Sequence, residues 1–296
     1  MVVASATKPP SSTSSPSSVK PKVFDILVGI DGTSSEDWLT TKDREDAKWM
    51  ATPRSKASGA KPPATKPKSQ AGSKQVYRNS HVWNFVHDFA TPDTRKRYFD
   101  GPGDLGFNTG TIVDSGFSFV TACLAEMMNE RKALLNRSGL ALADLNVRIS
   151  LIGHSRGALI AIRIAKRLRD HKLHTNVPTL SVHFMGLYDA VDRQIGEGGD
   201  TIPGNVAAAY HALRDPTVQS RSWFGNTGTK AHPPCRYTSK VFTATHSGVG
   251  GDPWGGDKPK QITKDMDMLG SEKVGTWMID MAKKENLILV AAQSGK

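Results

Sequence analysis

The stretch VRISLIGHSRGALIAIRIAKRL, residues 147–168, constrains the fold more than any other part of the sequence. An apolar run typical of a buried strand ends in the motif GHSRG at residues 153–157, and an apolar run with helical character follows directly. The pattern G-x-S-x-G between a strand and a helix is typical of a sharp turn that lifts the serine above the edge of a sheet. Such a turn has no room for side chains at the two glycine positions, Gly153 and Gly157. The stretch therefore predicts a nucleophile turn around Ser155, and a tight turn with an inert serine is the alternative.

Predicted strands and helices alternate along the chain. Apolar runs typical of strands occupy residues 23–33, 146–153, 179–187 and 240–245, and helical spacing of apolar residues occurs at 76–89, 114–136, 158–168 and 271–285. Short buried strands that alternate with helices favour a mostly parallel central sheet with helices on both faces. The predicted fold class is therefore α/β, and the G-x-S-x-G turn between a strand and a helix makes the prediction α/β-hydrolase-like. We expect a glycine-rich loop at 98–111, and a loop-rich region at 190–237 with one short helix around AAAYHALRD.

The chain has 296 residues, enough for one large α/β domain. We assign residues 22–296 to this catalytic domain and interpret residues 1–21, which are rich in Ser and Pro, as a disordered N-terminal segment. Residues from about 40 to 75 are interpreted as a flexible basic insert within the domain. The reason is that residues 51–74 carry six basic side chains, no acidic one and no large apolar one.

The net charge of +11 comes partly from this basic insert. A solvated loop is the favoured interpretation, and contact with anionic lipid headgroups or with a protein partner is the alternative. The sequence has no interleaved aromatic and basic residues, no zinc-ligand spacing and no recognition-helix pattern, so no nucleic-acid partner is expected. Cys123 and Cys235 are too few for a disulfide framework and are expected to be reduced thiols.

The N-terminal residues do not resemble a signal peptide, because no basic region precedes their short apolar start. The sequence contains no run of about 18 apolar residues, so no transmembrane helix is expected. We therefore expect a soluble protein, synthesised in the cytoplasm, that would need a specialised secretion system to leave the cell.

A serine hydroxyl needs a base, and the base needs an orienting carboxylate, before the serine can act as a nucleophile. In α/β-hydrolases the three groups follow in the order Ser, Asp or Glu, His, each after a strand. Asp189 and His246 each end a predicted strand, so Ser155, Asp189 and His246 are the candidate catalytic residues. Asp192, further into the same loop, and Asp252, close in sequence to His246, are the alternatives for the acid.

Four other histidines fit the role of the base less well. His183 lies in the middle of a predicted strand and is expected to be a packed residue, and His154 adjoins the serine within the turn. His211 falls in the predicted short helix, and His232 lies in a proline-rich loop.

An acyl-transfer site also needs N–H groups that hold the oxyanion. The N–H of Arg156, at the start of the helix after the serine, is the first candidate. Gly32 or Thr33, after the first predicted strand, is the second candidate, because glycine lets the backbone approach closely. The alternative is a simple turn in which Asp31 caps its own backbone, and the two interpretations are compatible.

Five short islands follow one another along the chain: IDGT (30–33), GHSRGA (153–158), GLYDAV (186–191), YHALRD (210–215) and HSGVGG (246–251). Together they resemble the type VI secretion lipase effectors, a family of α/β-hydrolases. Each island is a weak signal alone, but the series spans nearly the whole chain in the family's order.

The resemblance implies a hydrolase that cleaves ester bonds of phospholipids, with Ser155 as nucleophile, Asp189 as orienting acid and His246 as base. It implies neither a metal nor an organic cofactor. It also implies a phospholipid or other lipid ester as substrate, and a secretion-machine component or an immunity protein as partner. The sequence departs from the family pattern at Gly248, where an acid is usual, and at His154, where phenylalanine is frequent.

Two further functions stay open at this point. One is a soluble carboxylesterase or acyltransferase with a small-molecule substrate. The other is a non-catalytic binding protein on a hydrolase scaffold, in which the basic insert would serve a partner. If the substrate is a membrane lipid, contact with the membrane would come from Trp223 and Phe224 or from the basic insert.

Overall fold

The computed structural model describes residues 23–33, 80–88, 94–103, 108–135, 146–171, 180–192, 200–255 and 258–287. The predicted disordered segment at 1–21 and the predicted basic insert at about 40–75 lie outside the described residues, so both stay predictions.

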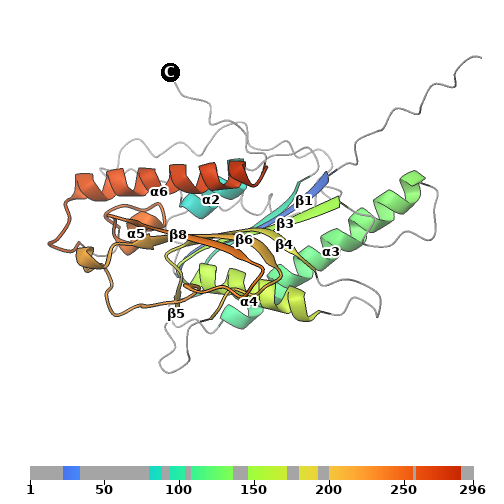
Figure 1. Cartoon of the computed structure of the whole chain (residues 1–296), viewed down its shortest axis with the longest axis horizontal. Helices are drawn as coiled ribbons and strands as arrows, with labels where there is room; N and C mark the ends of the chain where they lie inside the picture. The colour runs from blue at the N-terminus through green and yellow to red at the C-terminus, as the bar shows by residue number, and fades with distance from the viewer. Residues whose placement is uncertain are drawn as a thin grey trace, which may run out of the picture.

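A six-stranded sheet forms the centre of the molecule, with the strand order β2-β1-β3-β4-β6-β8 and parallel pairing throughout (Figure 1). Its strands are β1 (Val23–Ile30), β2 (Arg95–Phe99), β3 (Asn146–His154), β4 (Val182–Tyr188), β6 (Val206–Arg214) and β8 (Arg236–Phe242). A small antiparallel pair joins β5 (Val191–Asp192) to β7 (Gly225–Asn226). The prediction of an α/β fold with a mostly parallel sheet is confirmed.

Helices cover both faces of the sheet (Figure 1). Helices α2 (His81–Asp88) and α6 (Lys264–Lys284) lie over one face, and α3 (Thr109–Leu135) and α4 (Arg156–Asp170) lie over the other. Within the described ranges the remaining elements are two short turns, the 3₁₀ helix η3 (Pro216–Val218) and the single-turn helix α5 (His246–Val249).

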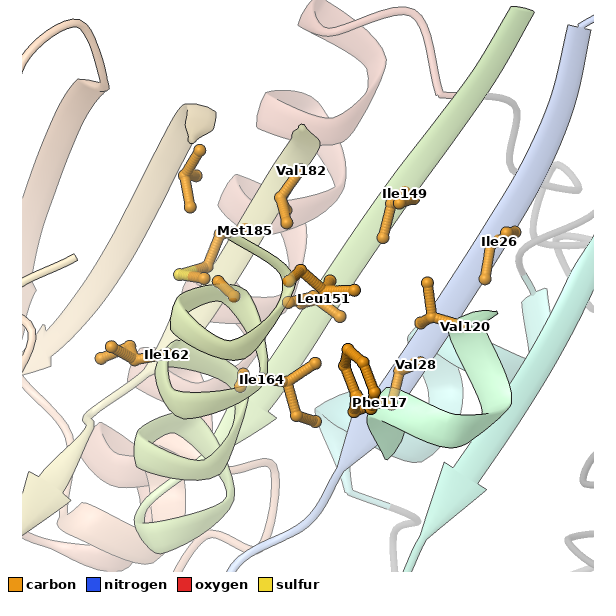
Figure 2. Close-up of a cluster of buried hydrophobic side chains, with 14 of the residues drawn as sticks. Ile26, Val28, Phe117, Val120, Ile149, Leu151, Ile162, Ile164, Val182 and Met185 are labelled. Atoms are coloured by element: carbon orange, nitrogen blue, oxygen red, sulfur yellow. The ribbon is translucent and has the colours of Figure 1, made fainter. Parts of the chain in front are cut away.

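Figure 2 shows the core between the sheet and the helices α3 and α4. Phe117 and Val120 of α3 and Ile162 and Ile164 of α4 meet strand residues such as Leu151 in one buried cluster. Burial of side chains of this size contributes about 1.5–3 kcal/mol each, so this layer fixes α4 firmly on the sheet. A firmly placed α4 fixes the turn that precedes it.

Helix α3 is, within the described residues, the one helix that is long and apolar enough to cross a membrane, from Thr109 to Ala133. The sequence had led us to expect no such helix. In the structure 44% of the apolar window is buried, and the side chains Val120, Cys123 and Met127 lie in the core cluster.

The expected short helix around AAAYHALRD is wrong, because these residues form strand β6. Alanine favours helices by intrinsic propensity, but this preference is weak beside burial. Strand β6 lies between β4 and β8, where Ala208 and Ala212 are buried against the α2/α6 layer and Ala209 against the α3/α4 layer. Small side chains on both faces suit a strand that helices cover on both sides.

The predicted glycine-rich loop at 98–111 is also partly wrong at its two ends. Strand β2 reaches Phe99, and α3 begins at Thr109. The sequence RKRYF of β2 lacks an apolar run because this strand lies at the edge of the sheet, which explains why periodicity missed it.

Candidate functional site

The sharp turn around Ser155 joins β3 to α4 at the carboxyl edge of the sheet. Ser155 has φ 56° and ψ −127°, a conformation that non-glycine residues rarely adopt. A Cβ on Gly153 would lie 2.5 Å from the carbonyl of Gly157, and a Cβ on Gly157 would lie 2.3 Å from the carbonyl oxygens of Ile30 and Asp31. Both glycines are therefore required by close backbone contacts, one across the turn and one with the end of β1.

The structure brings Ser155, His246 and Asp189 into one hydrogen-bonded chain. The Nε2 atom of His246 lies 2.9 Å from Ser155 Oγ, and its Nδ1 atom lies 2.6 Å from Asp189 Oδ2. An ionised carboxylate can only accept, so Nδ1 carries the proton and Nε2 is free to accept from the serine hydroxyl. All three side chains are at least 95% buried, which strengthens the electrostatic contacts among them.

Asp189 occupies the turn at the end of β4, and its N–H donates to Ala212 O at 2.7 Å. The two alternative acids lie elsewhere. Asp192 has its carboxylate 3.7 Å from the guanidinium of Arg163 on α4, and the carboxylate of Asp252 lies near that of Asp267. Of the three carboxylates, Asp189 is the one that hydrogen-bonds to His246 in the described structure.

His246 opens the helical turn α5, and it does not directly follow a strand as predicted, because β8 ends earlier, at Phe242. Thr245 caps this turn by accepting from the N–H of Gly248 through its side chain. Asp267 on α6 accepts in turn from the N–H of Thr245 at 2.7 Å and from its hydroxyl at 2.8 Å. The N–H of His246 donates to Ser220 Oγ at 2.7 Å, so the backbone around the imidazole is held from two sides.

Burial and charge act on the pKa of both members of the pair. Burial alone would raise the pKa of Asp189, but its hydrogen bond to His246 and the charge of Arg214 together lower it below the usual range. Burial lowers the pKa of His246, and the hydrogen bond that its Nδ1–H donates to Asp189 only partly offsets this effect. A neutral imidazole beside an ionised carboxylate is the state in which the histidine can accept a proton.

The loop after β1 lies against the serine turn. A Cβ on Gly32 would lie 2.7 Å from His154 Nδ1 and 3.3 Å from Ser155 Cβ. The N–H of Gly32 donates to Asp31 Oδ1 at 2.9 Å, which is the capped turn that we considered as the alternative. The N–H of Gly32 is thus engaged by Asp31, and the assignment of Arg156 with Gly32 or Thr33 to an oxyanion hole stays a prediction.

Asp31 itself is buried and accepts three hydrogen bonds. Its Oδ2 accepts from Tyr98 Oη at 2.8 Å and from Ser80 Oγ, in addition to the bond from Gly32. Burial raises the pKa of Asp31 to about 6 against the effect of these bonds. The contacts tie the loop after β1 to β2 and to the start of α2.

Three of the other histidines considered as the base form hydrogen bonds with backbone groups. His154 Nε2 lies 3.2 Å from the carbonyl oxygen of His246, and burial lowers the pKa of His154 well below its usual value. His211 accepts from the N–H of Ala190 at 3.0 Å, and burial lowers its pKa to about 4. His183 lies in β4 with Nε2 2.8 Å from Glu285 O.

Sequence reasoning missed two side chains that contact the site. Arg214, at the end of β6, donates to Asp189 Oδ2, and Asp267 holds the start of α5. Arg214 lies inside the island YHALRD, which was the available signal for it. No local pattern marks Asp267, because it contacts Thr245, the residue before His246, from a helix that follows later in the sequence.

Within the described ranges, no group of three or more His, Cys, Asp or Glu side chains is arranged to hold a metal ion. Both cysteines are free, and burial raises the pKa of Cys123 to about 12. A thiol with a raised pKa is a weak nucleophile near neutral pH.

No protein-family model matches the sequence, and no curated protein matches it either. Among solved structures, the chain is similar to an uncharacterized protein from Pseudomonas aeruginosa, with 13% identity, TM-score 0.47, and coverage of 91% of this chain and 47% of that chain. It is also similar to the Tle1 effector bound to the VgrG spike from the type 6 secretion system, with 18% identity, TM-score 0.30, and coverage of 78% and 52%. This chain therefore spans about half the length of each of these two proteins.

Proposed function

We propose that the protein is a serine hydrolase that cleaves carboxylic ester bonds of lipids, with Ser155, His246 and Asp189 as its catalytic residues. The observation that carries the proposal is the continuous chain of contacts from Ser155 Oγ to His246 Nε2 at 2.9 Å and from His246 Nδ1 to Asp189 Oδ2 at 2.6 Å. Distances of this kind are those of a nucleophile, its base and the group that orients the base.

The reaction would proceed in two halves. His246 Nε2 takes the hydroxyl proton of Ser155 as Oγ bonds to the acyl carbon, and the carbonyl oxygen becomes an oxyanion held by the N–H groups of Arg156 and Thr33. The intermediate collapses, the leaving alcohol takes the proton from His246, and an acyl-serine ester remains. Water then gives a proton to His246 and attacks the ester, which releases the acid and restores the serine.

The substrate class rests on the motif islands and on one exposed side chain. The islands resemble phospholipid-cleaving effectors of the type VI secretion system, and for this reason a phospholipid is the substrate we propose. Trp223 is 69% exposed beside Phe224, whose ring lies 5.2 Å from the ring of His246. An exposed indole beside the site suits a substrate presented at a lipid surface. A secretion-machine component and an immunity protein are the proposed partners on the same resemblance.

The test compares the wild-type protein with Ser155→Ala on phospholipid vesicles and on a soluble short-chain ester, with the released products identified. Release of fatty acid by the wild type alone supports a serine phospholipase and names the bond cleaved. Cleavage of only the short ester by the wild type supports a soluble esterase instead.

If neither substrate is hydrolysed, a fluorophosphonate probe distinguishes a reactive serine from an inert one. Labelling of the wild type but not of Ser155→Ala shows a reactive serine. Absence of both labelling and hydrolysis would contradict the proposal and favour a binding protein on a hydrolase scaffold.

A further inference from the structure

A buried guanidinium lies against the carboxylate of Asp189. Arg214 ends strand β6, and its side chain is 7% exposed beside the fully buried Asp189. Its Nη1 donates to Asp189 Oδ2, the same oxygen that accepts from His246 Nδ1, and its backbone N–H donates to Oδ1 at 3.3 Å. Both oxygens of Asp189 are therefore held by one residue, while one of them also faces the imidazole.

The other arm of the same guanidinium holds the backbone of the segment 221–224. Arg214 Nη2 donates to Phe224 O at 3.1 Å and to Arg221 O at 3.4 Å. The ring of Phe224 meets the ring of His246 edge-on at 5.2 Å, and Ser220 accepts from the N–H of His246. Arg214 thus joins the acid on one side of His246 to the segment that packs on the imidazole from another side.

An arginine is suited to this double contact because its planar fork presents several donors in a fixed geometry. A lysine ammonium is a point charge without this fork, so it cannot reproduce the two-armed geometry. The antiparallel pair β5 and β7 adds a second link, since it joins the residues after Asp189 to those after Phe224. The carboxylate, the guanidinium and the 221–224 segment consequently form one continuous support around His246.

The charged and titratable groups that face His246 come from four parts of the chain. Asp189 at the end of β4 favours the imidazolium, whereas Arg214 at the end of β6 and Arg221 in the following segment oppose it. His154 at the end of β3 lies with its ring 5.0 Å from that of His246, and burial lowers its pKa well below the usual value, which keeps it neutral. Loss of the positive charge of Arg214 would leave the imidazole easier to protonate.

We infer that Arg214 is a positioning residue, which fixes the carboxylate of Asp189 and the 221–224 segment around His246. Its positive charge also opposes protonation of the imidazole. This inference rests on the proposed function, because it assigns Arg214 a part in the same site. A purely structural ion pair would support folding without changing the proton affinity of His246, and this difference can be measured.

The experiment uses three variants of the full chain. Arg214→Met keeps the length of the side chain without its charge, and Arg214→Lys keeps the charge without the fork. Arg148→Met is the matched control, because Arg148 also forms a two-pronged ion pair, with the buried Asp25 at 2.8 Å, away from His246. Thermal unfolding establishes that each variant is folded, and Arg214→Lys keeps the test open if Arg214→Met does not fold.

We expect Arg214→Met to lower kcat for a soluble ester by about tenfold to a hundredfold, the effect of misplacing a reacting group by about 1 Å. The acidic limb of kcat/KM moves to higher pH in this variant. Arg214→Lys lowers kcat but leaves the limb close to its wild-type position, and Arg148→Met changes neither. Unchanged kcat and an unchanged limb in folded Arg214→Met would overturn the inference, as would an equal shift in Arg148→Met.

A titration of the histidine side-chain resonances by NMR, assigned with His246→Gln, measures the pKa of His246 without any need for turnover. If the wild type is inactive but Arg214→Met raises this pKa, the proposed function fails and the positioning of the pair stands. If the wild type is active and Arg214→Met leaves both kcat and this pKa unchanged, the inference fails and the proposed function stands.

Discussion

The carboxylate of Asp267 packs directly against Gly248, two residues after the candidate histidine. A Cβ on Gly248 would lie 2.1 Å from Asp267 Oδ1, so the carboxylate from α6 fills the place that a side chain at position 248 would occupy. The family that the sequence resembles has an acid at this position. In this chain a carboxylate reaches the same neighbourhood from a helix instead, where it accepts from the N–H and hydroxyl of Thr245 and from the N–H of Trp254.

Replacing Asp267 is therefore expected to weaken the support of His246. In Asp267→Asn the side-chain amide can accept at one atom only, which leaves buried donors of Thr245 or Trp254 unsatisfied and lowers the free energy of unfolding by about 1–3 kcal/mol. Urea denaturation measures the change. Asp265→Asn, an exposed carboxylate on the same helix, should stay within about 0.5 kcal/mol of the wild type. Equal stability of the two variants would show that Asp267 does not hold this turn.

A substitution at Gly248 tests the same relationship from the other side. Gly248→Ala places a methyl group against the buried carboxylate of Asp267, and the overpacking is expected to cost about 1–3 kcal/mol of stability. Gly248→Ala should cost less stability when it is introduced into Asp267→Ala than when it is introduced into the wild type, because the clashing carboxylate is then absent. Strictly additive losses would mean that the two positions do not compete for space.

The choice among the three candidate acids can be tested by kinetics. Asp189→Asn is expected to lower kcat by about four orders of magnitude, because the amide favours the wrong tautomer of His246. Asp192→Asn and Asp252→Asn should leave kcat within a few fold of the wild type, since their carboxylates face Arg163 and Asp267. A larger loss in Asp252→Asn than in Asp189→Asn would assign the acid to the other carboxylate.

The location of the site followed from local sequence signals, whereas its supports did not. Ser155, Asp189 and His246 each end a predicted strand, and parallel strands bring their carboxyl ends to one edge of the sheet, so their proximity could be anticipated. Helical propensity of an alanine-rich segment concealed β6, and with it the position of Arg214. Asp267 could not be found because its role depends on how α6 packs on the sheet, which no short pattern records.

The pH dependence of activity should reflect the buried state of His246. The imidazole accepts a proton only when neutral, so kcat/KM rises as pH rises through its pKa. Burial lowers this pKa from the ordinary value of 6.5, and we therefore expect the midpoint of the acidic limb below pH 6.5. Measurements with a soluble ester from pH 4 to pH 8 would locate it. A midpoint above 6.5 would mean that the charge of Asp189 outweighs burial.

His211 should make the fold sensitive to acid. Its pKa is lowered from 6.5 to about 4 in the folded protein, so the unfolded chain binds the extra proton first as pH falls through this window. The wild type should lose up to about 3 kcal/mol of stability between these values relative to His211→Gln, which lacks the titrating ring. The comparison is made by urea denaturation at several pH values. A difference between the two proteins that does not change with pH would contradict the prediction.

Trp223 provides the test of whether the substrate lies at a lipid surface. The indole is 69% exposed, and burial of a large apolar side chain in a bilayer interface is worth about 1.5–3 kcal/mol, or about tenfold or more in binding. Trp223→Ala should therefore lower hydrolysis of phospholipid vesicles by about tenfold while leaving hydrolysis of a soluble short-chain ester nearly unchanged. Binding of the Ser155→Ala and Ser155→Ala/Trp223→Ala proteins to vesicles, measured by sedimentation, separates docking from chemistry. An equal loss on both substrates would instead show that Trp223 supports the packing of Phe224 on His246, because a docking residue affects only the substrate that is held in a membrane.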